Sequence, residues 1–279
     1  MRRRWRRWVW IAAAFTVLAL ALRAFWLEPA SLRVASSTIA LEPGSHALDG
    51  LRIAVLADLH TGSPFNGVDK LAHIVADTNA AKPDLVLLVG DYVIKGVVGG
   101  SFVTPEDIAS KLRELHAPLG VYAVLGNHDW WLDAARVRAA LDAVAIPTLD
   151  DRAVSVDGPR HFWLAGVSDF WEGVHDVHRA LAGVGDDAPV ILFTHNPDVF
   201  PHVPARVALT IAGHTHGGQV CLPMLGRLIV PSRFGQRYAI GHVVEDGRHL
   251  FVSPGLGTSI IPVRFRVPPE ISLVTLSAR

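Results

Sequence analysis

The sequence predicts a mixed α/β (α+β) domain that follows a single transmembrane helix at the N-terminus. Apolar runs of strand length alternate with helical patterns from residue 51 onward, which is typical of an α/β layered domain. The stretch 219–277 is strand-like and rich in turns, so we expect a second, more antiparallel sheet there. Half of the 279 residues are apolar, which is enough to bury a substantial core in one domain.

The first 28 residues have the composition of a cytoplasmic basic start followed by a membrane anchor. Five arginines lie within the first seven positions, and the run 8–27 is apolar except for Thr16 and Arg23. Twenty helical residues span roughly 30 Å, the thickness of a bilayer's hydrocarbon core. Tryptophans at both ends of the run fit the interfacial belts. The positive-inside rule then places the N-terminus in the cytoplasm and the domain outside it, at the cell membrane.

Two other interpretations of this segment stay open. In a cleaved signal peptide, Val9–Leu22 would be the apolar region and Ala19–Ala21 a small-residue cleavage site, and the protein would be exported. The paired arginines would also suit twin-arginine export. A helix buried in a soluble protein is the third interpretation, but it gives the arginine cluster no purpose.

Charge and cysteine content exclude some classes of partner. The 26 basic and 26 acidic residues balance, so no basic field recruits nucleic acid, and nothing in the sequence calls for an obligate protein partner. The single cysteine, Cys221, cannot form an intrachain disulfide and is expected half-buried in a strand. Cysteine usage therefore leaves the compartment open.

The elements follow in order along the chain. Residues 29–49 are expected to link the anchor to a domain at 50–279, and the β-prone piece Leu32–Val34 could pair at a sheet edge. Strands are predicted at 51–57, 84–89, 121–125, 162–166, 190–194 and 207–212. Helices are predicted at about 67–81, 105–116, 132–144 and 174–183, with Pro105 at an early helical position after Thr104.

Polar side chains follow five of these strands at the point where each strand ends. They are Asp58, His60, Asp91, Asn127, His128, Asp129, His195, His214 and His216. The carboxyl ends of strands are where open α/β sheets bind ligands. The i, i+2 spacing of Asp58 with His60 puts both side chains on one side of an extended segment, and the same holds for His214 with His216. A glycine precedes Asp91, Asn127 and His214, as expected where backbone turns sharply near an ion.

These residue types predict a site for two divalent metal ions. Carboxylate, imidazole and amide oxygen suit manganese, iron, zinc or magnesium, without deciding among them. Two ions close together need an anionic bridge, and they can activate water and polarise a phosphoryl oxygen. A lone histidine is usually structural, but five clusters at strand ends in one chain are hard to obtain by chance.

The motif series resembles that of the calcineurin-like metallophosphoesterases. It consists of Asp58-x-His60, Gly90-Asp91, Gly126-Asn127-His128-Asp129, His195 and Gly213-His214-Thr215-His216. The resemblance implies a two-sheet β-sandwich flanked by helices. It implies one metal held by Asp58, His60, Asp91 and His216, and a second held by Asp91, Asn127, His195 and His214. It further implies that Asp91 bridges the two metals and that a metal-bound hydroxide attacks phosphorus in line.

The resemblance also implies roles at the substrate. His128 would contact the phosphate beside Asn127 and protonate the leaving oxygen, a contribution of about 10²–10⁴-fold for a general acid. The alternative is that His128 only orients its neighbours. Asp129 is expected to hold His128 in place.

The chain further resembles the YkuE/YaeI-type subgroup in His214–Gln219, Pro254–Thr258, Pro262–Phe265 and Pro268–Glu270. Many members of that subgroup carry an N-terminal membrane segment, and some related enzymes cleave UDP-2,3-diacylglucosamine. The function implied is a phosphodiesterase or pyrophosphatase acting on a lipid-linked or envelope phosphate. The alternatives are a broad phosphatase of phosphoproteins or small nucleotides and a non-catalytic scaffold. UDP-linked lipid precursors are handled in the cytoplasm, so either the substrate differs or the helix lies on the cytoplasmic face.

Five further residues have open roles. Arg264 and Arg266 could bind a substrate phosphate or brace a strand edge. Trp130, Trp131 and Trp171 could line the cleft or serve only packing.

Overall fold

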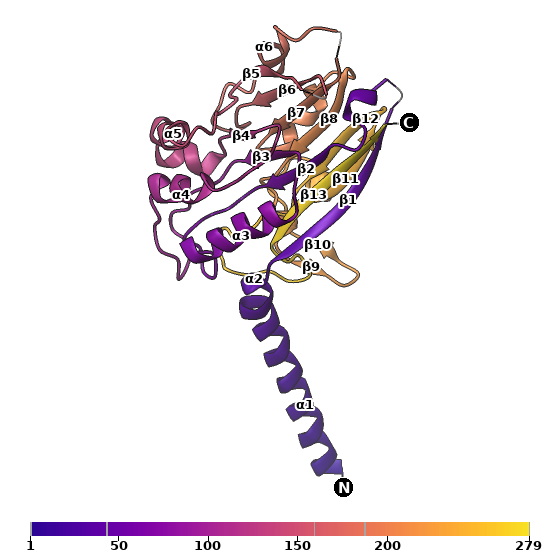
Figure 1. Ribbon diagram of the computed structural model, residues 1–279. Helices are drawn as coiled ribbons and strands as arrows, with labels where there is room; N and C mark the ends of the chain where they lie inside the picture. The colour runs from indigo at the N-terminus through magenta and orange to yellow at the C-terminus, as the bar shows by residue number, and fades with distance from the viewer. Residues whose placement is uncertain (1, 43, 159, 187, 279) are drawn as a thin grey trace.

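A computed structural model describes residues 2–42, 44–158, 160–186 and 188–278, and it contains two main sheets packed face to face (Figure 1). The first sheet has the order β1 (Arg33–Leu41), β13 (Glu270–Ala278), β2 (Arg52–Leu56), β3 (Leu85–Val89), β4 (Val121–Val124). The second has the order β11 (Gly241–Glu245), β12 (Arg248–Val252), β8 (Val207–Ala212), β7 (Val190–Thr194), β6 (Phe162–Val167), β5 (Arg152–Val156). A small hairpin joins β9 (Cys221–Leu222) to β10 (Gly226–Arg227). The predicted α/β class and two-sheet sandwich are confirmed.

Helices cover the outer faces of the two sheets. They are α3 (Val68–Ala80), α4 (Pro105–Leu112) and α5 (Asn127–Asp142) on the first sheet, and α6 (Val177–Leu181) on the second. Leu71 of α3 packs with Leu88 in one core, and Leu87 meets Phe193 between the sheets in another. Continuous apolar runs such as that of β3 suit strands with both faces buried.

Strand directions bring the predicted polar residues to the end of the domain from which the N-terminal helix projects (Figure 1). β1 begins next to that helix and runs parallel to β13, whereas β2 is antiparallel to β13. β2 therefore ends beside the helix, and β3 and β4 run parallel to it. Residues that follow β2, β3 and β4 consequently share this edge of the sheet.

Two expectations about the chain's ends are corrected. The segment 29–49 is no free linker, because β1 pairs with β13 over nine register positions and forms the sheet edge foreseen for Leu32–Val34. Residues 219–277 form only the small β9–β10 hairpin as a sheet of their own, since β11 and β12 extend the second sheet and β13 inserts between β1 and β2. Both differences arise because a strand's partner is set by tertiary packing and not by its own pattern.

The helices differ from prediction mainly at their ends. α5 begins at Asn127 and not at 132, because the carboxylate of Asp129 accepts the backbone N–H of Gly126 and caps a polar first turn. α4 begins as predicted, with the Thr104 side chain accepting the N–H of Asp107, but it ends at Leu112. The helix expected at 174–183 is limited to Val177–Leu181.

The N-terminal helix α1 (Arg2–Leu22) stands away from the domain and continues through a π-helical turn (Arg23–Leu27) into α2 (Glu28–Ala30) (Figure 1). The helical stretch Arg3–Ala30 is long and apolar enough to cross a membrane, and its apolar window is exposed throughout. The interpretation as the buried helix of a soluble protein is therefore wrong. A signal sequence has the same length and composition, so that alternative stays open.

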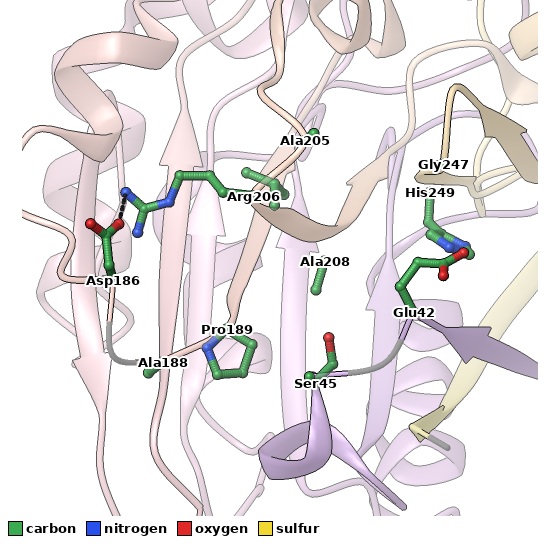
Figure 2. Close-up of a pocket in the computed structure, with 12 residues that line it drawn as sticks. Glu42, Ser45, Asp186, Ala188, Pro189, Ala205, Arg206, Ala208, Gly247 and His249 are labelled. Atoms are coloured by element: carbon green, nitrogen blue, oxygen red, sulfur yellow. Dashed lines mark ion pairs between the residues drawn. The ribbon is translucent and has the colours of Figure 1, made fainter.

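A cavity of about 310 Å³ lies at the opposite end of the second sheet (Figure 2). Glu42, Arg206 and His249 line it, and Arg206 forms an ion pair with Asp186 at 3.1 Å. Its position at the amino ends of β7 and β8 separates it from the predicted metal site.

Candidate metal centre

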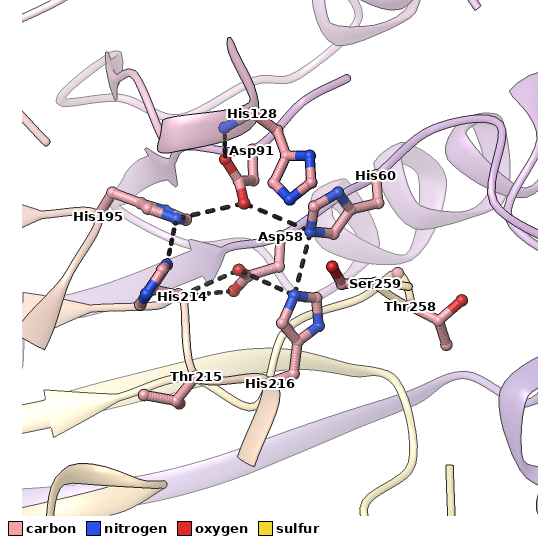
Figure 3. A network of polar contacts seen from close by, with 12 residues as sticks. Asp58, His60, Asp91, His128, His195, His214, Thr215, His216, Thr258 and Ser259 are labelled. Atoms are coloured by element: carbon pink, nitrogen blue, oxygen red, sulfur yellow. Dashed lines mark hydrogen bonds and ion pairs between the residues drawn. The ribbon is translucent and has the colours of Figure 1, made fainter. Parts of the chain in front are cut away.

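All seven predicted metal ligands converge in one buried cluster. Figure 3 labels each of them except Asn127. Asp58 and His60 follow β2, Asp91 follows β3, Asn127 begins α5, His195 follows β7, and His214 and His216 follow β8. None of these residues is more than 5% exposed. The convergence at strand ends is as the sequence predicted.

Asp91 lies between the two halves of this cluster. Its Oδ2 atom is 3.4 Å from His60 Nε2 on one side and 3.3 Å from His195 Nε2 on the other. On the His60 side, His60 Nε2 lies 3.0 Å from His216 Nε2, and Asp58 Oδ1 lies 3.5 Å from that same His216 atom. One carboxylate oxygen thus faces both donor sets.

The His195 side is equally compact. His195 Nε2 lies 3.1 Å from His214 Nδ1 and 3.2 Å from Asn127 Oδ1. His195 Nδ1 lies 2.7 Å from the carbonyl of Val89, which leaves Nε2 as the atom facing the cluster. A backbone carbonyl on the other ring nitrogen is the usual support of a metal-binding histidine.

The donor atoms fit divalent cations. Neutral imidazole nitrogens that face each other at 3.0 Å, as in His60 and His216, oppose lone pairs unless a proton or a cation lies between them. Two groups, Asp58/His60/His216 and Asp91/His195/His214, each bring three donor atoms within 4.8 Å of one another. The clusters can therefore hold metal ions.

The backbone at the cluster is strained, and here the sequence prediction was wrong. Asp58, His60, Asp91, His214 and His216 all have positive φ, between 40° and 70°. The segments are consequently tight turns and not extended strands, and the side chains converge because left-handed residues re-aim them. Such conformations cost about 1–3 kcal/mol each and cluster at functional sites.

The glycines before the ligands permit the close approach that the sequence indicated. A Cβ on Gly126 would lie 2.6 Å from the backbone nitrogen of Asp91. A Cβ on Gly213 would lie 2.8 Å from Asp58 Oδ2. No side chain fits in either place without moving a ligand.

Burial and neighbouring charges shift the pKa values of the acids and histidines in the cluster. Burial acts to raise the pKa of Asp91, but the charge and hydrogen bond of His195, together with the charges of His60 and His128, hold that pKa well below its usual range. Burial acts to lower the pKa of His195, but Asp91 and Asp58 raise it to about 10. Burial raises the pKa of Asp58 to about 7 and lowers the pKa of His60 and of His214 to about 3. The last two rings are therefore neutral at pH 7 and have a lone pair to offer.

His128 lies beside the cluster and forms part of the pocket wall. Its ring centroid is 4.7 Å from that of His60, and its backbone N–H donates to Asp91 Oδ1 at 2.9 Å. Burial lowers the pKa of His128, and the negative charge of Asp91 partly opposes this shift. The expectation that Asp129 holds this ring is wrong, because the Asp129 carboxylate accepts backbone N–H groups from both sides of the site. The donors are Asp91, Tyr92, Val93 and Gly126.

A pocket of about 230 Å³ opens over the cluster. Its walls include Trp131 and Trp171, whose rings lie 6.4 Å apart, whereas Trp130 packs into the core behind α5. Gln219, Ile229 and Ile260 also line it. The sequence did not reveal Ile229 and Ile260, because isolated residues in irregular loops carry no periodic signal, whereas Gln219 is the last residue of the motif His214–Gln219.

Arg264 has a structural role. Its side chain is fully buried and donates to the carbonyls of Pro254, Gly257 and Val267. It therefore braces the loop behind Asp58 and cannot reach a phosphate in the pocket. Arg266 is exposed.

The model of the calcineurin-like phosphoesterase family matches residues 51–218, which include every residue of the cluster. The chain belongs to this family. Its relatives in the family include a phosphodiesterase and a pyrophosphatase. The chain is accordingly a metal-dependent phosphoric ester hydrolase.

Relatives span nearly the whole chain. The uncharacterized metallophosphoesterase YkuE of Bacillus subtilis is 29% identical over 91% of this chain and 88% of its own length. Phosphodiesterase YaeI of Escherichia coli is 32% identical over 81% of this chain and 82% of its own. The UDP-2,3-diacylglucosamine pyrophosphatase LpxG of Chlamydia trachomatis is 27% identical over 95% of this chain and 97% of its own.

Proposed function

We propose that the protein is a dinuclear phosphodiesterase or pyrophosphatase acting on a lipid-linked phosphate. The observation that carries this proposal is the position of Asp91 Oδ2, 3.4 Å from His60 Nε2 and 3.3 Å from His195 Nε2, with a full donor set on each side. A single carboxylate shared in this way is what two adjacent cations require to offset their repulsion.

One cation would be held by Asp58, His60, Asp91 and His216, and the other by Asp91, Asn127, His195 and His214. The mixture of carboxylate, imidazole and amide oxygen suits manganese, iron, zinc or magnesium. Bound divalent cations supply Lewis acids for the phosphoryl oxygens and generate a nucleophile from water at neutral pH.

The chain's own residues orient the substrate. His128 lies on the pocket wall next to His60, so its ring can donate a hydrogen bond to the phosphate, and in its protonated form it can transfer a proton to the leaving oxygen. The Asn127 amide shares the same wall and contacts the phosphate beside it. Asp129 keeps the loops after β3 and β4 in register through its four backbone hydrogen bonds.

Two observations support a lipid-linked substrate. The pocket wall above the metal cluster is largely apolar and aromatic, formed by Trp131, Trp171, Ile229 and Ile260. The membrane-length helix leaves the domain at the same end (Figure 1). The relative LpxG is a UDP-2,3-diacylglucosamine pyrophosphatase, and its diacylated sugar nucleotide belongs to this substrate class.

The test is a metal-supplemented hydrolysis screen of the purified full-length protein. It compares bis-p-nitrophenyl phosphate, p-nitrophenyl phosphate and a lipid pyrophosphate, each with Mn²⁺, Zn²⁺, Fe²⁺ or Mg²⁺. We expect hydrolysis of the diester and of the lipid pyrophosphate, abolished in Asp91→Ala and retained in Asp246→Ala, which removes an exposed aspartate far from the cluster. Hydrolysis of the soluble monoester alone would refute the proposal.

We further propose that the N-terminus lies in the cytoplasm and the domain outside it. The arginine cluster before α1 supports this orientation. Alkaline phosphatase folds into its active form outside the cytoplasm, whereas a standard fluorescent protein becomes fluorescent inside it. We therefore expect a C-terminal alkaline phosphatase fusion to be active and a C-terminal fluorescent-protein fusion to be dark. The reverse pattern would place the domain in the cytoplasm.

A further inference from the structure

Exposed apolar side chains gather at the metal-site end of the domain. Six of them, each at least 62% exposed, come from three loops and are called the collar here: Val98, Met224, Leu225, Leu228, Ile229 and Ile260. Scattered apolar residues are normal on a protein surface, but a contiguous group marks an interaction site.

The three loops of the collar are joined to one another. The backbone N–H of Val98 lies 3.5 Å from the carbonyl of Ile260. The Gln219 side chain, which precedes the β9–β10 hairpin, donates to the carbonyl of Ser259 at 3.2 Å and accepts the N–H of Ser259 at 2.8 Å. The loops of the collar are therefore held together by hydrogen bonds of the backbone and of the Gln219 side chain.

The same loops hold the end of the membrane-length helix. The backbone N–H of Arg264 donates to the carbonyl of Ala24 at 2.9 Å, and the N–H of Val267 donates to Glu28 Oε1 at 2.6 Å. Trp26 contacts Phe65, with ring centroids 5.3 Å apart, in the loop that follows His60. If residues 8–27 cross a bilayer, these contacts put the collar at the level where the helix leaves the hydrocarbon.

The charge of the collar loops matches a lipid headgroup surface. The segments 94–103, 219–237 and 259–266 contain no aspartate or glutamate. Lys95, Arg233 and Arg266 supply exposed basic side chains, whereas the exposed Arg237 is ion-paired with Glu245. Apolar side chains ringed by basic ones are the pattern of a surface that lies in the interface of an anionic membrane.

We propose that the collar inserts into the interfacial layer of the bilayer that the helix spans, so that the catalytic pocket opens directly onto the membrane. Ile229 and Ile260 belong both to the collar and to the pocket wall, and they provide a continuous apolar path from metals to lipid. The substrate class that fits is an amphiphile whose acyl chains stay in the leaflet while its phosphate reaches the cluster. The membrane contact stands independently of the reaction, and only the substrate class rests on the proposed function.

The contact can be measured in the full-length protein in vesicles of phosphatidylcholine and phosphatidylglycerol. Cys221→Ser supplies a background without cysteine, and a fluorophore is attached at Met224→Cys or Leu228→Cys, neither of which lines the pocket. Val244→Cys is the matched control, because Val244 is also exposed but pairs with His249 near the opposite end. Each label is tested with iodide in water and with a lipid that carries a nitroxide near its headgroup.

We expect the labels at 224 and 228 to lose quenching by iodide and to be quenched by the nitroxide lipid, while the label at 244 behaves in the opposite way. Labels at 224 and 228 that iodide quenches as strongly as at 244 would overturn the proposal. Shielding from both quenchers would also overturn it, because another protein or a second copy would then cover the collar.

A second experiment measures ester hydrolysis separately from the contact between the collar and the membrane. The double variant Met224→Asp/Leu225→Asp should abolish lipid quenching at 228 while hydrolysing bis-p-nitrophenyl phosphate at the parental rate. Quenching that persists in this variant would count against insertion. If the parent protein contacts lipid but hydrolyses no ester, the proposed function fails and the collar stands.

Discussion

Metal binding should release protons in a pH-dependent way that follows from the buried charges of the cluster. Burial raises the pKa of Asp58 to about 7. Burial acts to lower the pKa of His195, but Asp91, Asp58 and Asp169 together raise it to about 10. A proton therefore occupies His195 throughout the neutral range and occupies Asp58 below about pH 7. Geometry supports a protonated His195 in the metal-free protein, because one ring nitrogen faces the Val89 carbonyl and the other faces Asp91.

The magnitude follows from the two pKa values. At pH 6 binding of both ions displaces about two protons, and at pH 8 about one. Overall affinity should rise about a hundredfold between pH 5 and 6, and about tenfold per unit once Asp58 is ionised. At pH 7, which is three units below the pKa of His195, the proton must be removed from His195 before a metal can bind. This deprotonation makes binding less favourable by about 4 kcal/mol. The sign is fixed, because both pKa values are raised and affinity can only increase with pH.

Isothermal titration calorimetry with Mn²⁺ in two buffers of different ionisation enthalpy counts these protons. Asp58→Asn is the matched control, because it has no proton to lose at this position and should release about one proton at both pH values. A parent protein that releases no proton at pH 8 would show that His195 is neutral there, and the electrostatic account of the cluster would fail.

Three further perturbations test other parts of the site. Asp91→Asn should reduce metal-dependent hydrolysis by at least about 100-fold and lower the bound metal measured by plasma mass spectrometry, because it removes the shared charge. His128→Asn should lower kcat by about 10²–10⁴-fold at unchanged metal content, and a loss of metal would contradict its role at the substrate. Arg264→Met leaves three buried backbone carbonyls without a hydrogen-bond donor and removes a positive charge near Glu28. We therefore expect the free energy of unfolding to fall by about 3 kcal/mol. That corresponds to about 10 °C in the unfolding midpoint, and an unchanged midpoint in a thermal scan would contradict the bracing role.

Much of the fold was predictable because buried parallel strands leave a simple pattern. The apolar run 84–89 coincides with β3 almost to the residue. β5 escaped prediction because it is an edge strand of mixed polarity, with most of its side chains only half-buried. The insertion of β13 between β1 and β2 was also missed, since no local feature of the sequence Glu270–Ala278 indicates which strands it pairs with.

The candidate site shows the same division between local and tertiary information. The candidate ligands could be picked out because each follows a strand end, yet the left-handed turns at Asp58 and His214 could not be predicted. Aspartate and histidine adopt such conformations more readily than most residues, but only the surrounding packing selects them. The collar was invisible as well, because Met224 and Leu228 lie in loops without periodicity.

The pairing of β1 with β13 has a consequence for biosynthesis. Arg33 and Glu270, which form an ion pair across these strands, are separated by 237 positions in the chain. The first strand emerges from the ribosome directly after the hydrophobic helix, but its hydrogen-bonding partner β13 is made only after the other described strands of both sheets. Until then β1 and one edge of β2 have no neighbour in the sheet, and such long-range pairing is slow. The growing chain therefore carries β1 without its partner until β13 has been made, and a nonsense mutation at Glu270, which removes β13, would leave two strand edges open to aggregation.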